Sequence, residues 1–249
     1  MVLILLALLP AIALAVWIYR QDAVEKEPAG LLWKVFFFGV LSIIPILIME
    51  LLLDDVLLAL FEEGTLAYIL ADNFIGVALV EEFWKMRAAK RAAWKHPAFN
   101  YKFDAIVYCV ISALGFAAIE NVMYVMDSGL ATALSRMVLS VPSHAIDGLI
   151  MGYFFGIAKE ADLAQDRKRR RKYLRYAVLV PTIEHGIYDT SLSLESDWLM
   201  LFFFVFVIAV DIWAYRFVKK QAGADRALGR GRGETMESSL DQSSEGDYF

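Results

Sequence analysis

The sequence predicts an all-α, polytopic membrane protein with about seven transmembrane helices, four of which carry a cluster of ionisable residues. Of the 249 residues, 59% are hydrophobic and only 21% are charged, and the mean hydropathy is +0.53. Soluble domains contain only about 45–50% apolar residues. The apolar residues are also grouped into windows of about 20 residues, the length that crosses a hydrocarbon core of about 30 Å as a helix.

Seven such windows lie between clusters of charged residues, and each predicts one span. The first has no Lys or Arg before its apolar run, whereas a signal peptide begins with positive charges, so we expect a retained helix. In chain order the predicted spans are residues 1–19, 31–53, 65–84, 103–126, 134–157, 173–193 and 198–218. The charged residues that bound the later windows are Glu27, Asp54, Glu63, Lys85, Lys102, Asp127, Lys159, Lys172, Asp197 and Lys219. Residues 1–220 are therefore predicted to form one membrane domain.

The distribution of Lys and Arg between the windows predicts the orientation, because these residues accumulate in short loops on the cytoplasmic side. The connections after the third and fifth windows are basic, while the alternate connections are acidic with Arg136 as their only nearby cation. The basic residues are Lys85, Arg87, Lys90, Arg91, Lys95, Lys102, Lys159 and the run from Arg167 to Lys172. We expect a multi-pass protein of the cell membrane with its N-terminus outside, its C-terminus in the cytoplasm and its basic loops touching anionic lipids.

The rest of the composition excludes several classes of protein. The formal net charge of -5 is too acidic for a nucleic-acid-binding protein, which needs a basic surface to meet phosphates. The single cysteine, Cys109, cannot form an internal disulfide or a cysteine zinc cluster. Residues 221–249 are rich in Gly, Ser, Glu and Asp, and we expect a disordered cytoplasmic tail because they cannot bury enough apolar surface to offset their ordering entropy.

Ionisable residues within the predicted spans are candidates for a functional site, because a charge at the centre of a membrane helix costs about 2.5–3.5 kcal/mol on insertion scales. They gather in the third to sixth spans: Glu81, Glu82 and Lys85; Glu120 and Asn121; His144 and Asp147; and Glu184, His185 and Asp189. Glu50 and Asp211 lie nearer the ends of other spans, without a histidine or second acid close in sequence, and are placed outside the site. His96 lies in a basic loop and is expected to be solvated.

The acids of the third span are spaced to contact a lysine. Lys85 follows Glu81 by four residues and Glu82 by three, so one acid can pair with the lysine while the other turns inward. An ordinary ion pair at the membrane interface explains the same pattern. Two adjacent glutamates also disfavour joint ionisation, which raises the pKa of one of them towards the range of a general base.

The two membrane histidines are spaced to be oriented by acids. Asp189 follows His185 by four residues and can fix the tautomer of its imidazole. Asp147 follows His144 by three residues and allows the same arrangement. Two such pairs opposite a helix with paired glutamates favour a polar site over packing alone.

Four motifs in these spans resemble those of the PrsW family of intramembrane proteases. They are EExxK at residues 81–85, FxxxEN at residues 116–121, a histidine at His144 in the next span, and HxxxD at residues 185–189. Each motif is short, but all four occur in order, each in its own predicted helix. The family is similar to the CAAX-type prenyl proteases, which have a histidine and an arginine where this chain has Glu120 and Met86. This departure argues against prenyl-protein processing.

The resemblance implies a multi-helix protease with a four-helix catalytic core that hydrolyses a peptide bond of a membrane-anchored protein. For bacterial members it suggests a first cut in a membrane-bound anti-sigma factor. The candidate catalytic residues are Glu81, Glu82, Glu120, His144 and His185, with Lys85, Asn121 and Asp189 in support.

We expect a glutamate of the Glu81/Glu82 pair, with a histidine, to deprotonate a water that attacks a substrate carbonyl. His185 would stabilise the oxyanion or share the proton, with His144 as the alternative for either role. Asn121 would add a hydrogen-bond donor, and the neighbouring lysine would keep the second glutamate ionised.

Two alternatives stay open. Glu and His are also zinc ligands, so the same residues are compatible with a zinc-dependent protease, although no HExxH motif occurs and the glutamate mechanism needs no metal or other cofactor. Buried Glu and His residues also form proton relays, so the alternative from another class is a proton-coupled transporter. A relay needs a track across the membrane, whereas these residues are predicted to cluster. A non-catalytic scaffold would not require so many buried ionisable groups.

Overall fold

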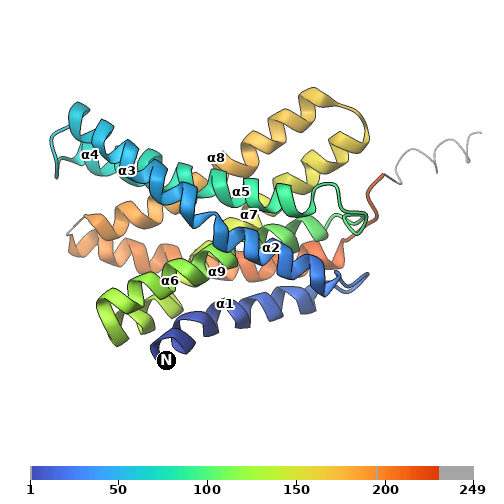
Figure 1. Cartoon of the computed structure of the whole chain (residues 1–249), viewed down its shortest axis with the longest axis horizontal. Coiled ribbons are helices and arrows are strands. Elements are labelled where there is room, and N and C mark those ends of the chain that lie inside the picture. The colour runs from blue at the N-terminus through green and yellow to red at the C-terminus, as the bar shows by residue number, and fades with distance from the viewer. Residues whose placement is uncertain (1, 195, 230–249) are drawn as a thin grey trace, which may run out of the picture.

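The computed structural model describes residues 2–194 and 196–229, most of which are helical (Figure 1). The helices in chain order are α1 (Val2–Gln21), α2 (Ala29–Leu41), α3 (Ile43–Leu60), α4 (Leu66–Ala71), the π-helix η1 (Asp72–Ala78), α5 (Leu79–Ala93), α6 (Asp104–Val138), α7 (Ser140–Leu163), α8 (Arg167–Ser193) and α9 (Asp197–Gly223). The predicted all-α fold is confirmed. Each predicted window overlaps one helix or a series of consecutive helices.

Four stretches of the described residues are long and apolar enough to cross a membrane: Leu3–Gln21, Ala29–Leu60, Asp104–Leu163 and Asp197–Gly223. The third of these stretches contains both α6 and α7. The helices that include the predicted spans 65–84 and 173–193 are more strongly charged and are not among the four. Several membrane helices are therefore supported, and the number seven stays a prediction.

Two helix boundaries differ from the prediction, and the first difference moves the acid pair. Helix α5 continues to Ala93 instead of ending at Trp84, because alanines among its charged residues pack into the core. The alanines are Ala88, Ala89, Ala92 and Ala93. Glu81 and Glu82 consequently lie near the middle of the continuous helical stretch Leu66–Ala93 rather than at its end. The basic run from Arg167 to Lys172 forms the first turns of α8, not a loop, and Asp166 caps it.

Helix α6 reverses direction at Gly129. This residue has φ +78 and ψ -157, a conformation open to glycine and outside the helical region. In a straight helix, residues 16 positions apart are about 24 Å apart, yet Arg136 reaches Glu120 at 2.5 Å. The predicted break between residues 126 and 134 is thus confirmed, with helix continuing on both sides of it.

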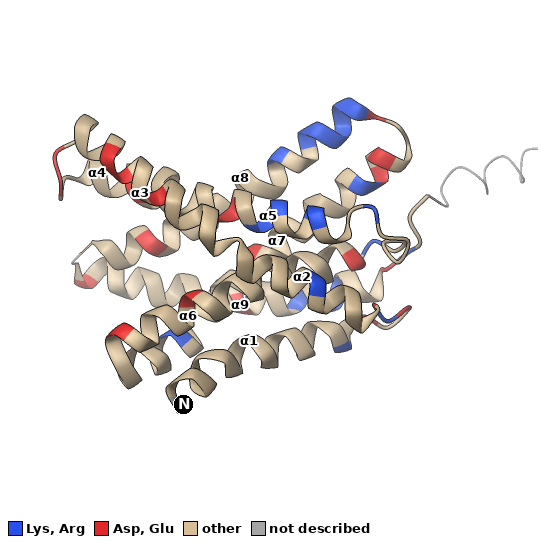
Figure 2. Cartoon of the chain, viewed as in Figure 1, with Lys and Arg blue, Asp and Glu red and all other residues tan. Residues whose placement is uncertain are grey.

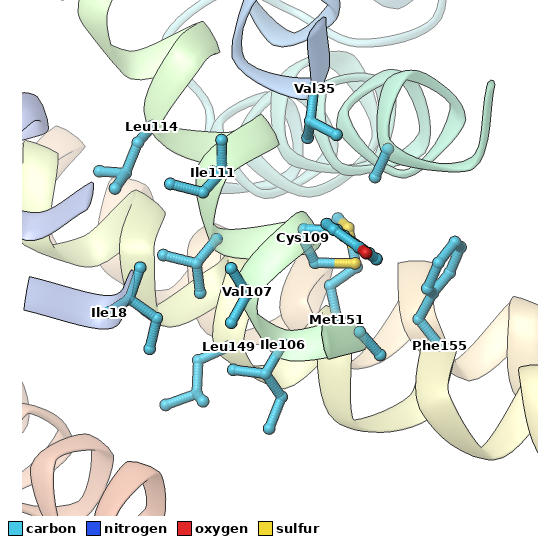
Figure 3. Packing of buried hydrophobic residues seen from close by; sticks show 14 of the residues in the cluster. Ile18, Val35, Ile106, Val107, Cys109, Ile111, Leu114, Leu149, Met151 and Phe155 are labelled. Atoms are coloured by element: carbon cyan, nitrogen blue, oxygen red, sulfur yellow. The ribbon is translucent and has the colours of Figure 1, made fainter. Parts of the chain in front are cut away.

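The apolar core surrounds α6, which α1, α2 and α7 cover, and Figure 3 shows its packing around Ile106, Cys109 and Met151. Helices α6 and α7 approach closely because glycines of α7 face α6. A Cβ added at Gly152 would lie 2.5 Å from the Cα of Ile106, and one added at Gly148 would lie 2.7 Å from the Cα of Val110. The glycines of α7 therefore let the two helices pack backbone against backbone.

Charge is distributed unevenly along the molecule. Figure 2 shows Lys and Arg gathered near the end of α5, the end of α7 and the start of α8, while acidic residues mark the opposite end, around the connection of α3 to α4 and the bend of α6. We call these two ends the basic end and the acidic end. The predicted orientation of the protein in the membrane rests on this uneven distribution of Lys and Arg.

The beginning of the predicted disordered tail is in place at the basic end. Helix α9 continues to Gly223, and the residues after it contact the start of α6. The backbone N–H of Leu228 donates to the carbonyl of Asn100 at 2.7 Å, and the N–H of Phe103 donates to Asp225 Oδ1 at 2.8 Å. The disorder predicted for residues 221–229 is therefore wrong. The prediction rests on composition, which does not reveal these hydrogen bonds. The prediction for residues 230–249 lies outside the described residues.

Candidate active site

The four helices predicted to carry the site bring their ionisable side chains into one buried cluster around Lys85. Its Nζ lies 2.8 Å from Glu81 Oε2 and 2.8 Å from Glu82 Oε1. It also lies 3.1 Å from His144 Nδ1 and 4.4 Å from the centre of the Phe116 ring. The lysine side chain is fully buried. One ammonium group thus joins α5, α6 and α7.

The spacing of the EExxK motif explains both contacts within α5. Residues three and four apart lie on one side of a helix, and both glutamates pair with Lys85. The expectation that only one acid pairs while the other turns inward is therefore wrong. The two glutamates differ instead in access: Glu81 is 4% exposed, whereas Glu82 is 0% exposed.

The contacts of His144 fix its tautomer. A lysine ammonium has donors and no acceptor, so His144 Nδ1 must accept the hydrogen bond from Lys85. The proton of the neutral imidazole is then on Nε2, which lies 3.0 Å from Glu120 Oε2 and donates to it. The i,i+3 partner Asp147 has its Oδ2 3.9 Å from Nδ1, too far for a hydrogen bond, so the expected orientation of His144 by Asp147 is wrong. Lys85 and Glu120 orient this histidine instead.

His185 lies between two acids. Its Nε2 is 3.1 Å from Asp189 Oδ2, as the i,i+4 spacing predicts, and its Nδ1 is 3.1 Å from Glu82 Oε1. The imidazole can donate to both carboxylates only when it carries both protons. Its ring meets that of His144 edge to face, with centroids 5.4 Å apart. The two histidines of the motifs are thus adjacent.

A glycine lets α8 approach the π-helix that precedes α5. A Cβ added at Gly186 would lie 2.4 Å from the ring of Phe74 in η1, so a larger residue would separate the two helices. Near the same contact, Asn73 Nδ2 donates to Ser193 Oγ at 3.2 Å. The residue after the histidine in HxxxD, Gly186, is therefore small because it packs against Phe74. This close contact of α8 with η1 places His185 next to α5.

Glu120, the acid of the FxxxEN motif, pairs with Arg136, a cation that is not among the predicted site residues. Arg136 donates to Glu120 Oε2 at 2.5 Å and to Asn121 Oδ1 at 3.1 Å. Asn121 Nδ2 donates in turn to the carbonyl of Ala7 in α1, at 2.7 Å. Both ends of the Asn121 amide are therefore engaged outside the central cluster. The signal for Arg136 was present, since it is a lone cation in an acidic connection.

A cavity of about 720 Å³ opens beside the cluster. Glu81, Glu120, His144 and His185 line it, and Glu82 and Lys85 lie behind them. The lining also includes Glu50, because α3 forms one wall of the cavity, so the placement of Glu50 outside the site is wrong. Further polar lining residues lie toward the acidic end, among them Asn73, Asp127, Ser135, Arg136, Ser140 and Ser193. None of the lining residues comes from the basic connections.

The remaining ionisable residues fall into two groups. Asp147 and Glu184 are close to the cluster, and Asp147 Oδ2 lies 3.7 Å from His185 Nδ1. Asp211 lines a separate groove between α1, α7 and α9, and His96 accepts a hydrogen bond from the N–H of Ala98 in its own loop. Neither Asp211 nor His96 lines the cavity beside the cluster.

The cluster also has the donor set of a zinc site. Glu81, Glu82, His144 and His185 each offer one ligand atom, and these atoms lie within 4.8 Å of one another. Imidazole nitrogens with carboxylate oxygens are ligands that zinc prefers. Glu82 Oε2 is buried and accepts no hydrogen bond, so it is free to bind a cation. The residues therefore fit a zinc ion. In the structure, the positive charge next to the two glutamates is that of Lys85.

Comparisons with known proteins identify the family. The family model described as PrsW family intramembrane metalloprotease matches residues 27–214. The chain is 36% identical over 217 residues to "Protease PrsW" of Geobacillus kaustophilus, and the matched region covers 87% of this chain and 91% of the relative. It is 33% identical over 201 residues to "Protease PrsW" of Bacillus subtilis, covering 80% of this chain and 87% of the relative. No solved structure matches.

Proposed function

This chain belongs to the PrsW family of intramembrane proteases, and on that premise we propose that it is an endopeptidase that hydrolyses a peptide bond of a membrane-anchored protein with a water activated by Glu81. The observation that carries the proposal is the position of Glu81, whose carboxylate lines the cavity beside both motif histidines. Because the family is one of proteases, the transporter alternative is not carried further.

Glu81 is the general base in this proposal. It has access to the cavity, whereas Glu82 is enclosed by Lys85 and His185. Glu81 takes a proton from water as the water oxygen attacks the substrate carbonyl carbon, and it returns this proton to the leaving amine nitrogen when the peptide bond breaks. Lys85 holds the Glu81 carboxylate in place through an ion pair at 2.8 Å.

His144 is the donor to the oxyanion in this proposal. Its tautomer places a proton on Nε2, which lines the cavity and currently donates to Glu120. A carbonyl oxygen that gains negative charge is a better acceptor for this N–H than it is in the ground state. His185 is a positioning residue, because both of its nitrogens are engaged with Glu82 and Asp189.

A zinc-dependent route is the second candidate, and the converging donor set favours it. His144, His185 and a glutamate of the pair would hold the ion, which when bound supplies a water with a pKa of about 7. In that case the other glutamate of the pair would be the proton acceptor, and Lys85 would keep its carboxylate near the site. The two routes thus use the same residues and differ in their response to chelators.

We also propose the orientation that the charge pattern predicts, with seven passes and the basic end in the cytoplasm. The cavity reaches Asp127 and Ser135, near the acidic end, so the cut is proposed to lie toward the extracytoplasmic side of the membrane. The resemblance to the family suggests a membrane-bound anti-sigma factor as the substrate. The basic first turns of α8 are proposed to contact anionic lipids.

Cleavage of a membrane-anchored reporter in proteoliposomes tests the proposal. The reporter carries a candidate anti-sigma transmembrane segment, and mass spectrometry of the products locates the cut. We expect His144→Ala to abolish cleavage, and we expect the matched control His96→Ala, which changes the histidine outside the cavity, to leave it unchanged. Normal cleavage by correctly inserted His144→Ala protein would rule out the proposed site.

A further inference from the structure

A second cluster of buried carboxylates lies at the basic end, away from the catalytic cavity. Asp22 follows α1, Glu27 precedes α2, and Asp104 is the first residue of α6. Their exposed fractions are 1%, 3% and 0%. One carboxylate oxygen from each residue lies within 4.8 Å of those of the other two. Three acids from two separate parts of the chain thus meet in a small buried space.

Hydrogen bonds satisfy only some of these carboxylate oxygens. Asp104 Oδ2 accepts from the backbone N–H groups of Asn100 and Tyr101, at 2.9 and 2.7 Å, and Glu27 accepts from the hydroxyl of Tyr108. In contrast, both oxygens of Asp22 and Oδ1 of Asp104 are buried and have no hydrogen-bond partner. A buried carboxylate without a partner is costly. These three oxygens are therefore free to bind a ligand.

Protein cations do not neutralise the cluster. No ion pair within residues 2–194 and 196–229 includes any of the three acids. The nearest lysine, Lys26, directs its ammonium to backbone carbonyls at the end of α1, including that of Tyr19 at 2.9 Å. Three buried acids therefore meet here without an ion pair from the described residues to balance their charge.

We propose that Asp22, Glu27 and Asp104 bind a hard divalent cation, Ca²⁺ or Mg²⁺, at the basic end of the molecule. Oxygen-only ligands suit these ions, whereas zinc sites in proteins usually include nitrogen or sulfur. The catalytic cluster, with its two imidazoles, has the other kind of donor set. Water completes the coordination, as is usual for both ions.

The cation has a structural role in this proposal. It ties the connection between α1 and α2 to the start of α6, where residues 225–228 also pack through hydrogen bonds to Asn100 and Phe103. Helices α1 and α2 both pack along α6, so the cation stabilises the end of a three-helix unit. Binding to the folded state alone raises stability in proportion to the logarithm of the cation concentration above Kd.

Thermal unfolding of the purified full-length protein in detergent tests the proposal. After chelation, millimolar Ca²⁺ or Mg²⁺ is expected to raise Tm by about 5–10 °C if the concentration reaches about 100 times Kd. Asp22→Asn and Asp104→Asn are expected to lose this response, whatever their own Tm. Glu25→Gln, which removes an exposed acid of the same loop, is the matched control and should keep it.

Terbium luminescence gives a direct readout on the wild-type protein, so the test does not depend on how the variants fold. Tb³⁺ takes oxygen ligands as Ca²⁺ does, and Tyr108, which hydrogen-bonds to Glu27, is placed to sensitise it. We expect bound Tb³⁺ emission that Ca²⁺ displaces. A Tm that does not respond to either cation, or a response that persists in both variants, would overturn the proposal. If the acids share protons instead, Tm will fall with rising pH and ignore the cations, which also overturns it.

Discussion

Lys85 Nζ lies 3.1 Å from His144 Nδ1, although the two residues are 59 positions apart on α5 and α7. Because the ammonium can only donate, this contact leaves the proton of His144 on Nε2, where it faces Glu120 and the cavity. The same ammonium forms ion pairs with both Glu81 and Glu82. Lys85 therefore sets both the charge of the acid pair and the tautomer of the histidine.

Replacing Lys85 by methionine tests this arrangement. The substitution leaves two buried glutamates without their cation, and loss of one partner of a buried ion pair costs about 3–5 kcal/mol. We expect a clearly lower Tm and no reporter cleavage. Adding Glu81→Gln and Glu82→Gln to Lys85→Met removes the uncompensated charges and should restore most of the Tm, but not the cleavage. A single variant as stable as the wild type would contradict the ion-pair geometry.

The reversal of α6 at Gly129 makes a second prediction. Any other residue at φ +78 and ψ -157 is strained by about 1–3 kcal/mol, and no atom lies within 4 Å of an added Cβ, so the cost of Gly129→Ala is purely conformational. Strain here also displaces Arg136 from Glu120, so cleavage should fall with Tm. Gly30→Ala is the matched control: its added Cβ also meets open space, but within a helix, and Tm should be unchanged or slightly higher. Equal Tm values for the two variants would contradict the reversal.

Truncation separates the two parts of the C-terminal segment. A chain that ends after Gly229 keeps the hydrogen bonds of Asp225 and Leu228 to the start of α6, and we expect its Tm and cleavage to match those of the full chain. A chain that ends after Lys220 loses them and should unfold at lower temperature. If the shorter chain is as stable as the longer one, these contacts add nothing to stability.

Metal removal distinguishes the two catalytic routes. The purified protein is treated with a nitrogen-donor chelator such as phenanthroline, with Mg²⁺ and Ca²⁺ kept in excess so that the oxygen-ligand cluster is unaffected. The glutamate route predicts unchanged cleavage. Loss of cleavage that zinc restores, with no change in Tm, identifies the zinc route instead.

Sequence patterns predicted the features that depend on local spacing. The i,i+3 and i,i+4 positions of Glu81, Glu82 and Lys85, and of His185 and Asp189, correspond to contacts in the structure. The helical windows also correspond to helices, because apolar length is a local property.

Features that depend on long-range packing were not predictable in this way. Glu120 meets His144 only because Lys85 positions that histidine from another helix. Arg136 reaches Glu120 only through the reversal at Gly129, and Glu50 joins the cavity because α3 closes one side of it. None of these contacts joins residues at a regular helical spacing, so no periodic pattern in the sequence reveals them. The acid pair also does not lie at the end of its helix as the predicted span 65–84 implies, because charged residues do not by themselves end a helix and α5 continues past them.

The central claim is that Glu81, facing the cavity, is the base and that Glu82 behind it is not. Single-turnover cleavage of the reporter by Glu81→Gln, with Tm measured on the same sample, tests this most directly. We predict a rate at least about 100-fold below that of the wild type, in keeping with the size of general-base contributions, at a Tm that falls less than in Lys85→Met, because Lys85 keeps its ion pair with Glu82. Glu82→Gln, which removes the negative charge that pairs with Lys85 and His185 in the buried cluster, should instead lower Tm. Cleavage by folded Glu81→Gln at the wild-type rate would contradict the account.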